Sequence, residues 1–141
     1  MTTPLTAREY AYLLIVGPGK HERITEILGI QPSDACNADE TNWKTGRPCK
    51  RMFWKWKSGL DDTRPMQEHI EAILRWFHLK GDAVRELWVD YDLILECVGH
   101  YPASTGPGIY FNREIIRQVA QLGLAIDCDF YFVEDPHRAE N

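Results

Sequence analysis

The stretch WVDYDLILECV, residues 88–98, decides the fold class, because apolar and acidic side chains alternate along most of its length. A β-strand places successive side chains on opposite faces of its sheet, so a period of two predicts one face toward a core and one toward solvent. The segment AIDCDFYFV, residues 125–133, shows the same alternation. Strands that are buried on both faces read instead as continuous apolar runs. These two stretches therefore predict a sheet whose helices lie mainly on one face.

The remaining elements follow from the spacing of apolar residues. Segments 20–28, 64–79 and 112–122 have the helical period, and a glycine follows each of them. Segments 10–16 and 52–57 are further predicted strands. This order predicts an α+β two-layer sandwich with a mixed or antiparallel sheet. A Leu-Gly pair follows both the first and the last helix, which allows a duplicated strand-helix-strand unit, although Leu-Gly is also a common helix ending.

Length and charge narrow the function classes. The 141 residues predict a single domain over 1–141, with an ordered core at 8–134 and short polar tails. The net charge of −5 does not favour nucleic acid, because binding to phosphates needs a basic surface. The longest apolar run, 11–16, is much shorter than the roughly 20 residues of a membrane-spanning helix. No signal peptide is visible at the first residues, so we expect a cytoplasmic protein that binds no membrane.

The four cysteines show no zinc-ligand spacing. Cys97 and Cys128 alternate with apolar neighbours, which is typical of small buried residues. Cys36 and Cys49 flank the long loop 30–51 and could approach each other. In a reducing cytoplasm we do not expect them to form a disulfide.

Several short motifs are shared with one family. They are Glu9–Leu13 and Ile24–Pro32, the loop Lys44-Thr45-Gly46, the tryptophan strand Trp54–Ser58, Leu122-Gly123-Leu124 and the acidic segment Asp127–Asp129. With these motifs the chain resembles the bacterial domain-of-unknown-function family 4279 over residues 8–134. The family name implies no established activity, so the resemblance assigns no catalytic residue.

The residues themselves also show no recognised catalytic motif. The chain has no G-x-S-x-G, H-E-x-x-H or G-x-G-x-x-G motif, and Gly17-Pro18-Gly19-Lys20 lacks the spacing of a phosphate loop. The five histidines form no close pair, and His69 and His78 are expected on the polar side of their helix. We therefore predict a protein that is not an enzyme and that needs no cofactor.

The strongest surface feature is a row of carboxylates on the outward face of the two alternating strands. Like charges side by side on a sheet are destabilising unless solvent or a partner relieves them. The row is either a docking face for a basic protein segment or a charged face that prevents edge-to-edge aggregation. The Asp-x-Asp pairs offer oxygen ligands to a hard cation, but no histidine or glycine loop accompanies them, so no metal site is predicted. The candidate partner-binding residues are Asp90, Asp92, Glu96, Asp127 and Asp129.

A second candidate site involves the loops 31–50 and 100–108. Trp43, Arg47 and Tyr101 are its candidate residues, as the rim of a small-molecule pocket that these loops would close. The tryptophans and lysines between Trp43 and Lys57 are also compatible with stacking on a nucleic-acid strand, although Trp54 and Trp56 share one side and fit core packing better.

Together these observations favour a protein-binding module over an enzyme. Its most specific form is an immunity-type protein that neutralises a bacterial toxin through the acidic face. The alternative is a small-molecule-binding or regulatory domain with a pocket under the two loops. The sequence does not specify the oligomeric state.

Overall fold

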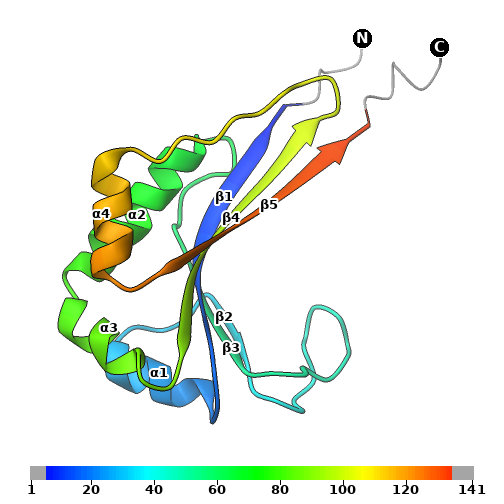
Figure 1. Cartoon of the computed structure of the whole chain (residues 1–141). Helices are drawn as coiled ribbons and strands as arrows, with labels where there is room; N and C mark the ends of the chain where they lie inside the picture. Colours follow the sequence, from blue (N-terminus) through cyan, green and yellow to red (C-terminus); the bar gives the residue numbers. More distant parts are fainter. Residues whose placement is uncertain (1–5, 135–141) are drawn as a thin grey trace.

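The sheet has five strands in the order β2-β3-β1-β4-β5, as the computed structural model shows for residues 6–134 (Figure 1). All neighbours are antiparallel except β4 and β5, which are parallel. The strands are β1 (Arg8–Val16), β2 (Asp34–Cys36), β3 (Phe53–Lys57), β4 (Asp92–Pro102) and β5 (Ala125–Val133). The expected mixed sheet is confirmed, and the predicted tails lie, except for Thr6 and Ala7, outside the described residues.

Four helices cover one face of this sheet. They are α1 (His21–Leu28), α2 (Met66–His78), α3 (Gly81–Leu87) and α4 (Arg113–Gln121), and Figure 1 shows them on the same side. The predicted α+β class with helices on one face is therefore confirmed. None of the helices among the described residues has the length and apolar character needed to cross a bilayer.

The alternation of side chains along each strand explains which face of the sheet the helices cover. In β1, Ala11, Leu13 and Ile15 are buried against the helices, whereas Tyr10 and Tyr12 point to the other face and are half-buried. The register continues this division across the sheet, because Leu13 is paired with Trp56 on one side and Leu95 on the other. The core lies between the sheet and the helices and includes the fully buried Trp54, whose Nε1 donates to Thr25 Oγ1 at 3.1 Å.

Two helix ends carry ordinary capping residues. Asn112 precedes α4, and its Oδ1 accepts a hydrogen bond from the Ile115 backbone N–H at 2.8 Å, which satisfies a free donor of the first turn. Gly29 follows α1 with φ of 71°, a left-handed conformation that costs glycine little because it has no Cβ.

The predicted strand 88–98 is wrong in its first part. The helix α3 ends at Leu87, a turn follows over residues 88–90, and β4 begins only at Asp92. Val89, which the alternation placed in the core, is 87% exposed. The physical reason is that four residues of apparent alternation also fit the end of a short helix and a turn, so periodicity alone does not separate the two.

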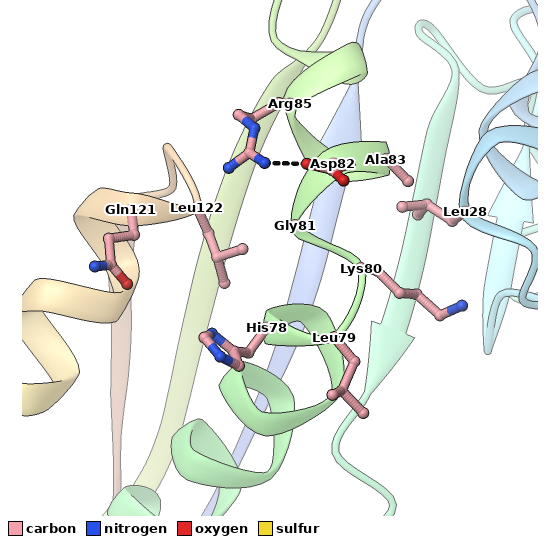
Figure 2. A pocket seen from close by; sticks show the side chains of 10 residues that line it. All are labelled: Leu28, His78, Leu79, Lys80, Gly81, Asp82, Ala83, Arg85, Gln121 and Leu122. Carbon is pink, nitrogen blue, oxygen red and sulfur yellow. Dashed lines mark hydrogen bonds and ion pairs between the residues drawn. The ribbon is translucent and has the colours of Figure 1, made fainter.

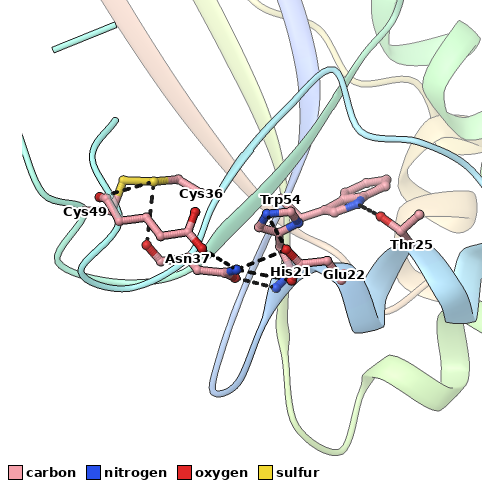
Figure 3. Close-up of polar contacts among 8 residues, drawn as sticks. His21, Glu22, Thr25, Cys36, Asn37, Cys49 and Trp54 are labelled. Carbon is pink, nitrogen blue, oxygen red and sulfur yellow. Dashed lines mark hydrogen bonds and ion pairs between the residues drawn. A yellow bond between two sulfur atoms is a disulfide. The ribbon is translucent and has the colours of Figure 1, made fainter. Parts of the chain in front are cut away.

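The long loop 30–51 contains an edge strand that its composition did not reveal. β2 is only three residues long and pairs with β3 through Ala35 and Trp54 at its centre. At the end of β2, Cys36 forms a disulfide with Cys49, and the two Cα atoms are 6.6 Å apart (Figure 3). The expectation that these two cysteines stay free is therefore wrong for this structure, because the loop returns through a Thr41–Pro48 bridge.

Asn37 ties the same loop to the start of α1. Its Oδ1 accepts from the His21 backbone N–H at 2.7 Å, and its Nδ2 donates to Glu22 Oε2 at 3.1 Å and to Glu40 Oε1 at 2.9 Å. The hydrogen bond from Asn37 lowers the pKa of the Glu22 carboxyl. Asn37 thus caps α1 from a distant part of the chain, and with the disulfide it fixes the loop.

β5 is an edge strand that is exposed on both faces. Ile126 and Phe132, which were expected to point into the core, are 37% and 57% exposed, and Cys128 is exposed as well. Their inward direction is correct, because Cys128 is in register with the buried Cys97, but the helices do not extend over β5. The two strand-helix-strand segments also differ in topology, since β3 separates β1 from β2 whereas β4 and β5 are neighbours.

Candidate functional site

An acidic cluster lies on the uncovered face of the sheet, where β4 and β5 run side by side. Glu96 of β4 is in register with Asp127 of β5, and Asp129 follows two residues later on the same face. One carboxylate oxygen from each of the three side chains lies within 4.8 Å of the others. We call these three residues the acidic cluster.

Glu96 is buried although no helix covers it. Only 6% of its surface is exposed, because β4 is an inner strand with β1 on one side and β5 on the other. Its Oε2 has no hydrogen-bond partner among the described residues. Burial, together with the Asp127 carboxylate, raises the pKa of Glu96 to about 7, since both disfavour its charged form.

No basic residue neutralises the acidic cluster by direct contact within residues 6–134, where the ion pairs involve other carboxylates. The cation that acts on Glu96 from this face is Lys55 of β3. Its Nζ lies 5.1 Å from the centre of the Tyr12 ring and 4.8 Å from that of Phe53. Burial lowers the pKa of Lys55.

Aromatic rings form the border of the acidic cluster. Tyr12 is in register with Glu96, and burial followed by the Glu96 charge raises the pKa of its hydroxyl. Further along the same face, Tyr10 stacks on His100 at 6.3 Å and His100 stacks on Tyr131 at 5.0 Å. Such rings attract cations through their π-faces. The face therefore combines carboxylates with aromatic surface.

Two of the five predicted partner-binding residues lie outside the acidic cluster. Asp90 belongs to the turn before β4 and does not share the strand's alternation, so its inclusion in the row is wrong. Asp92 does lie on the uncovered face, but four residues separate it from Glu96, which is roughly 13 Å along a strand. The structure brings together Glu96, Asp127 and Asp129.

The residues of the second predicted site are not brought together. The loop that carries Trp43 and Arg47 lies beyond the Val16 end of β1, whereas His100 pairs with Arg8 at the other end. Eight residues of β1 separate these ends, roughly 26 Å at about 3.3 Å per residue. The two loops therefore cannot close one pocket, and the expectation that Trp43 and Tyr101 share a rim is wrong.

These residues have local contacts of their own. Trp43 is 76% exposed and its Nε1 donates to Asp34 Oδ1 at 3.3 Å, while Arg47 is exposed in the same loop. Tyr101 is buried, and its hydroxyl donates to Glu9 Oε2 at 3.0 Å on the face opposite the acidic cluster. Its ring lies against Gly99, where a Cβ would be 2.3 Å away, so this packing requires glycine.

The structure has a hollow of about 660 Å³ in the helix layer instead. Figure 2 shows it between the end of α2, the start of α3 and the end of α4, with His78 and Leu79 on one side. Asp82 and Arg85 at its edge form an ion pair with each other. Because Leu79 is 82% exposed and Asp82 and Arg85 pair with each other, the hollow does not gather polar groups toward one point.

Sequence reasoning missed the burial of His69 and of Glu96, and also that of Asn37 described above. His69 was expected on the polar side of α2 but is fully buried, and its Nδ1 lies 2.6 Å from Ser58 Oγ. Glu96 was expected in a wet row but is almost completely buried. The alternation of β4 does place Glu96 on the uncovered face, yet its burial depends on the neighbouring strands, which local patterns do not specify.

Fold and site together define an α+β domain with an open mixed sheet, whose uncovered face carries a partly buried acidic cluster. The chain belongs to the family of a domain of unknown function, DUF4279, whose model matches residues 7–133. The resemblance seen in the short motifs is thereby confirmed. No curated protein and no solved structure matches the chain.

Proposed function

We propose that this protein is a non-enzymatic binding module that docks a positively charged segment of another protein on the uncovered face of its sheet. The observation that carries the proposal is the acidic cluster, in which three carboxylates lie together without a basic partner in the described residues. A partner's lysine or arginine would relieve their repulsion and gain charge-assisted hydrogen bonds.

The surroundings of the acidic cluster support the same class of ligand. Tyr10, Tyr12 and Tyr131 line this face, and their rings favour an approaching ammonium or guanidinium group. The exposed second edge of β5 leaves room for a segment to lie along the strand. The net charge of −5 adds a longer-range attraction that speeds association at low salt.

A more specific form of the proposal is an immunity-type protein that neutralises a bacterial toxin. An acidic face suits this function, because toxin domains that act on nucleic acid present basic surfaces. The chain also lacks the common catalytic motifs, which supports binding rather than catalysis.

The test compares two variants with the same kind of charge change. In the double variant Asp127→Lys and Asp129→Lys the acidic cluster is reversed, whereas Asp90→Lys changes an exposed turn outside it. A tagged wild-type chain is used to isolate and identify its protein partner from the native host, and affinity is then measured with the purified partner at two salt concentrations.

We expect the double variant to bind at least tenfold more weakly and to lose much of its salt dependence, while Asp90→Lys binds like the wild type. Circular dichroism checks that each variant is folded. The proposal fails if no stable partner is found, or if the double variant binds as tightly as the control.

A further inference from the structure

The carboxyl of Glu96 lacks the contact that a buried charged group normally has. Its Oε2 is buried and has no partner among the described residues, and the whole residue is 6% exposed. Buried polar groups are almost always hydrogen-bonded or bound to a metal, because desolvation without compensation is costly. The carboxylates of Asp127 and Asp129 lie within 4.8 Å of Glu96 on this face. A protonated Glu96 can donate one hydrogen bond to a neighbouring carboxylate, but ionised Glu96 faces only acceptors, so these neighbours cannot satisfy its charged form.

The three carboxylates have the composition and spacing of a site for a hard cation. Each offers an oxygen atom, and the three atoms lie within 4.8 Å of one another. They come from two paired strands, in which Glu96 is in register with Asp127 and Asp129 follows two residues later, so the backbone holds the three residues at a fixed spacing. Asp127 and Asp129 are exposed, so water can fill the coordination positions that the protein leaves open.

We propose that Glu96, Asp127 and Asp129 form a Ca²⁺ site on the uncovered face of the sheet. Two oxygens on opposite sides of Ca²⁺ lie about 5 Å apart at Ca–O distances of 2.3–2.6 Å, whereas the same span across Mg²⁺ is about 4.2 Å. All three oxygens lie within 4.8 Å of one another, which fits inside the Ca²⁺ span. The choice of Ca²⁺ rests on the number of protein carboxylates, because Mg²⁺ usually binds only one or two of them and keeps its waters. Ca²⁺ also accepts six to eight ligands in irregular geometry, and carboxylates bind it in one-oxygen or two-oxygen mode.

The affinity is expected to be modest. The site contains three protein carboxylates and is open to water on one side, whereas tight sites surround the ion with protein ligands. We expect a Kd on the order of 10⁻⁴ to 10⁻³ M, as in other weak Ca²⁺ modules.

The inference does not rest on the proposed docking of a basic segment, since Ca²⁺ is added to the chain alone. It does connect to that proposal, because the ion and a partner's lysine or arginine would compete for the same three carboxylates. Loss of the docking proposal would leave the Ca²⁺ site untouched, and loss of the Ca²⁺ site would leave the docking face available.

The experiment titrates Ca²⁺ into the full chain, after treatment with a chelator, and follows binding by calorimetry and by the melting temperature. Glu96→Gln and Asp127→Asn each remove one charge from the acidic cluster with little change in shape. Asp92→Asn removes the same charge from the same face, four residues from Glu96, and is the matched control. Mg²⁺ is titrated in parallel.

We expect one Ca²⁺ per chain, at least tenfold weaker binding in Glu96→Gln and in Asp127→Asn, and wild-type binding in Asp92→Asn. The melting temperature should rise with Ca²⁺ in the wild type and the control only. The site is refuted if 10 mM Ca²⁺, about ten times the weakest expected Kd, produces neither heat nor a melting shift. It is also refuted if Asp92→Asn weakens binding as much as the cluster variants, and Mg²⁺ binding at least as tight as Ca²⁺ would overturn the assignment to calcium.

Discussion

Replacement of Glu96 by glutamine is expected to stabilise the protein at neutral and alkaline pH. Glu96 is buried beside Asp127, and both conditions disfavour its charged form. Glutamine has nearly the same shape and carries no charge, and its amide group can donate to the carboxylate of Asp127. The substitution therefore removes a repulsive group without opening a cavity in the sheet.

The size of the effect follows from the pKa. The fold raises the pKa of Glu96 from the ordinary 4.5 to about 7, and each pH unit corresponds to about 1.36 kcal/mol. Below pH 4.5 the carboxyl is protonated in both states, and its contribution to stability is fully present. Between pH 4.5 and about 7 the unfolded chain loses the proton first, so this contribution falls with pH. Above pH 7 the unfolding free energy of the wild type is lower by about 3 kcal/mol for this reason, and Glu96→Gln does not undergo this loss.

The assay is urea unfolding followed by tryptophan fluorescence between pH 5 and pH 8.5, with a chelator present so that no divalent ion contributes. The informative quantity is the difference in unfolding free energy between variant and wild type, since the other titrating groups are shared. We expect a small difference at pH 5 that grows to about 3 kcal/mol in favour of the variant at pH 8. Glu86→Gln, at an exposed position of α3, is the control and should show no such growth. A difference that stays constant with pH would refute the reasoning.

Two further substitutions test the fold around the loop and the core. The Cys36–Cys49 disulfide spans 13 residues, so its reduction, or Cys49→Ala, should lower the unfolding free energy by about 3 kcal/mol. Mass measurement before and after alkylation tests whether the bond forms. Alkylation of all four cysteines without a reductant would contradict it. Trp54→Phe should lower the free energy of urea unfolding by about 2–3 kcal/mol, because it leaves a cavity and removes the hydrogen bond to Thr25. Thr25→Val removes only the hydrogen bond and should lower it by about 1 kcal/mol. Equal losses in the two variants would argue against a packing contribution.

The local patterns were sufficient for the fold class, because the alternation in 93–98 and 125–133 and the helical spacing of α2 and α4 all survive in the structure. The local patterns failed where a segment fits both the strand period and the helix period, and where a strand forms only by pairing with a distant part of the chain. Residues 88–91 fit both a strand and a helix end, and the short β2 depends on its pairing with β3 rather than on its own composition. The prediction that one face of β5 is buried was wrong for a related reason, since no sequence pattern shows how far the helices extend across a sheet.

For the candidate site, the informative signal was the alternation of side chains between the two faces of a strand. It placed Glu96, Asp127 and Asp129 on one face, as the structure does, and it placed Asp90 with them only because the start of β4 was set too early. The burial of Glu96 was beyond the reach of the sequence, because it requires β1 and β5 as neighbours of β4. That arrangement pairs Glu96 with Asp127, 31 residues away, on one side and with Tyr12, 84 residues away, on the other.

The position of Glu96 separates two explanations for an acidic residue on an uncovered sheet. A carboxylate that only keeps a wet face soluble gains nothing from burial, and the exposed Asp127 and Asp129 would already serve that purpose. A carboxylate that binds a cation gains from a dry, fixed position, and the fold has to bear the cost when the cation is absent. Both explanations allow Glu96→Gln to be more stable above pH 7, but they predict different effects on binding. If the residue serves solubility, the variant changes neither ion nor partner binding. If it serves binding, the variant loses its ligand even though it is more stable.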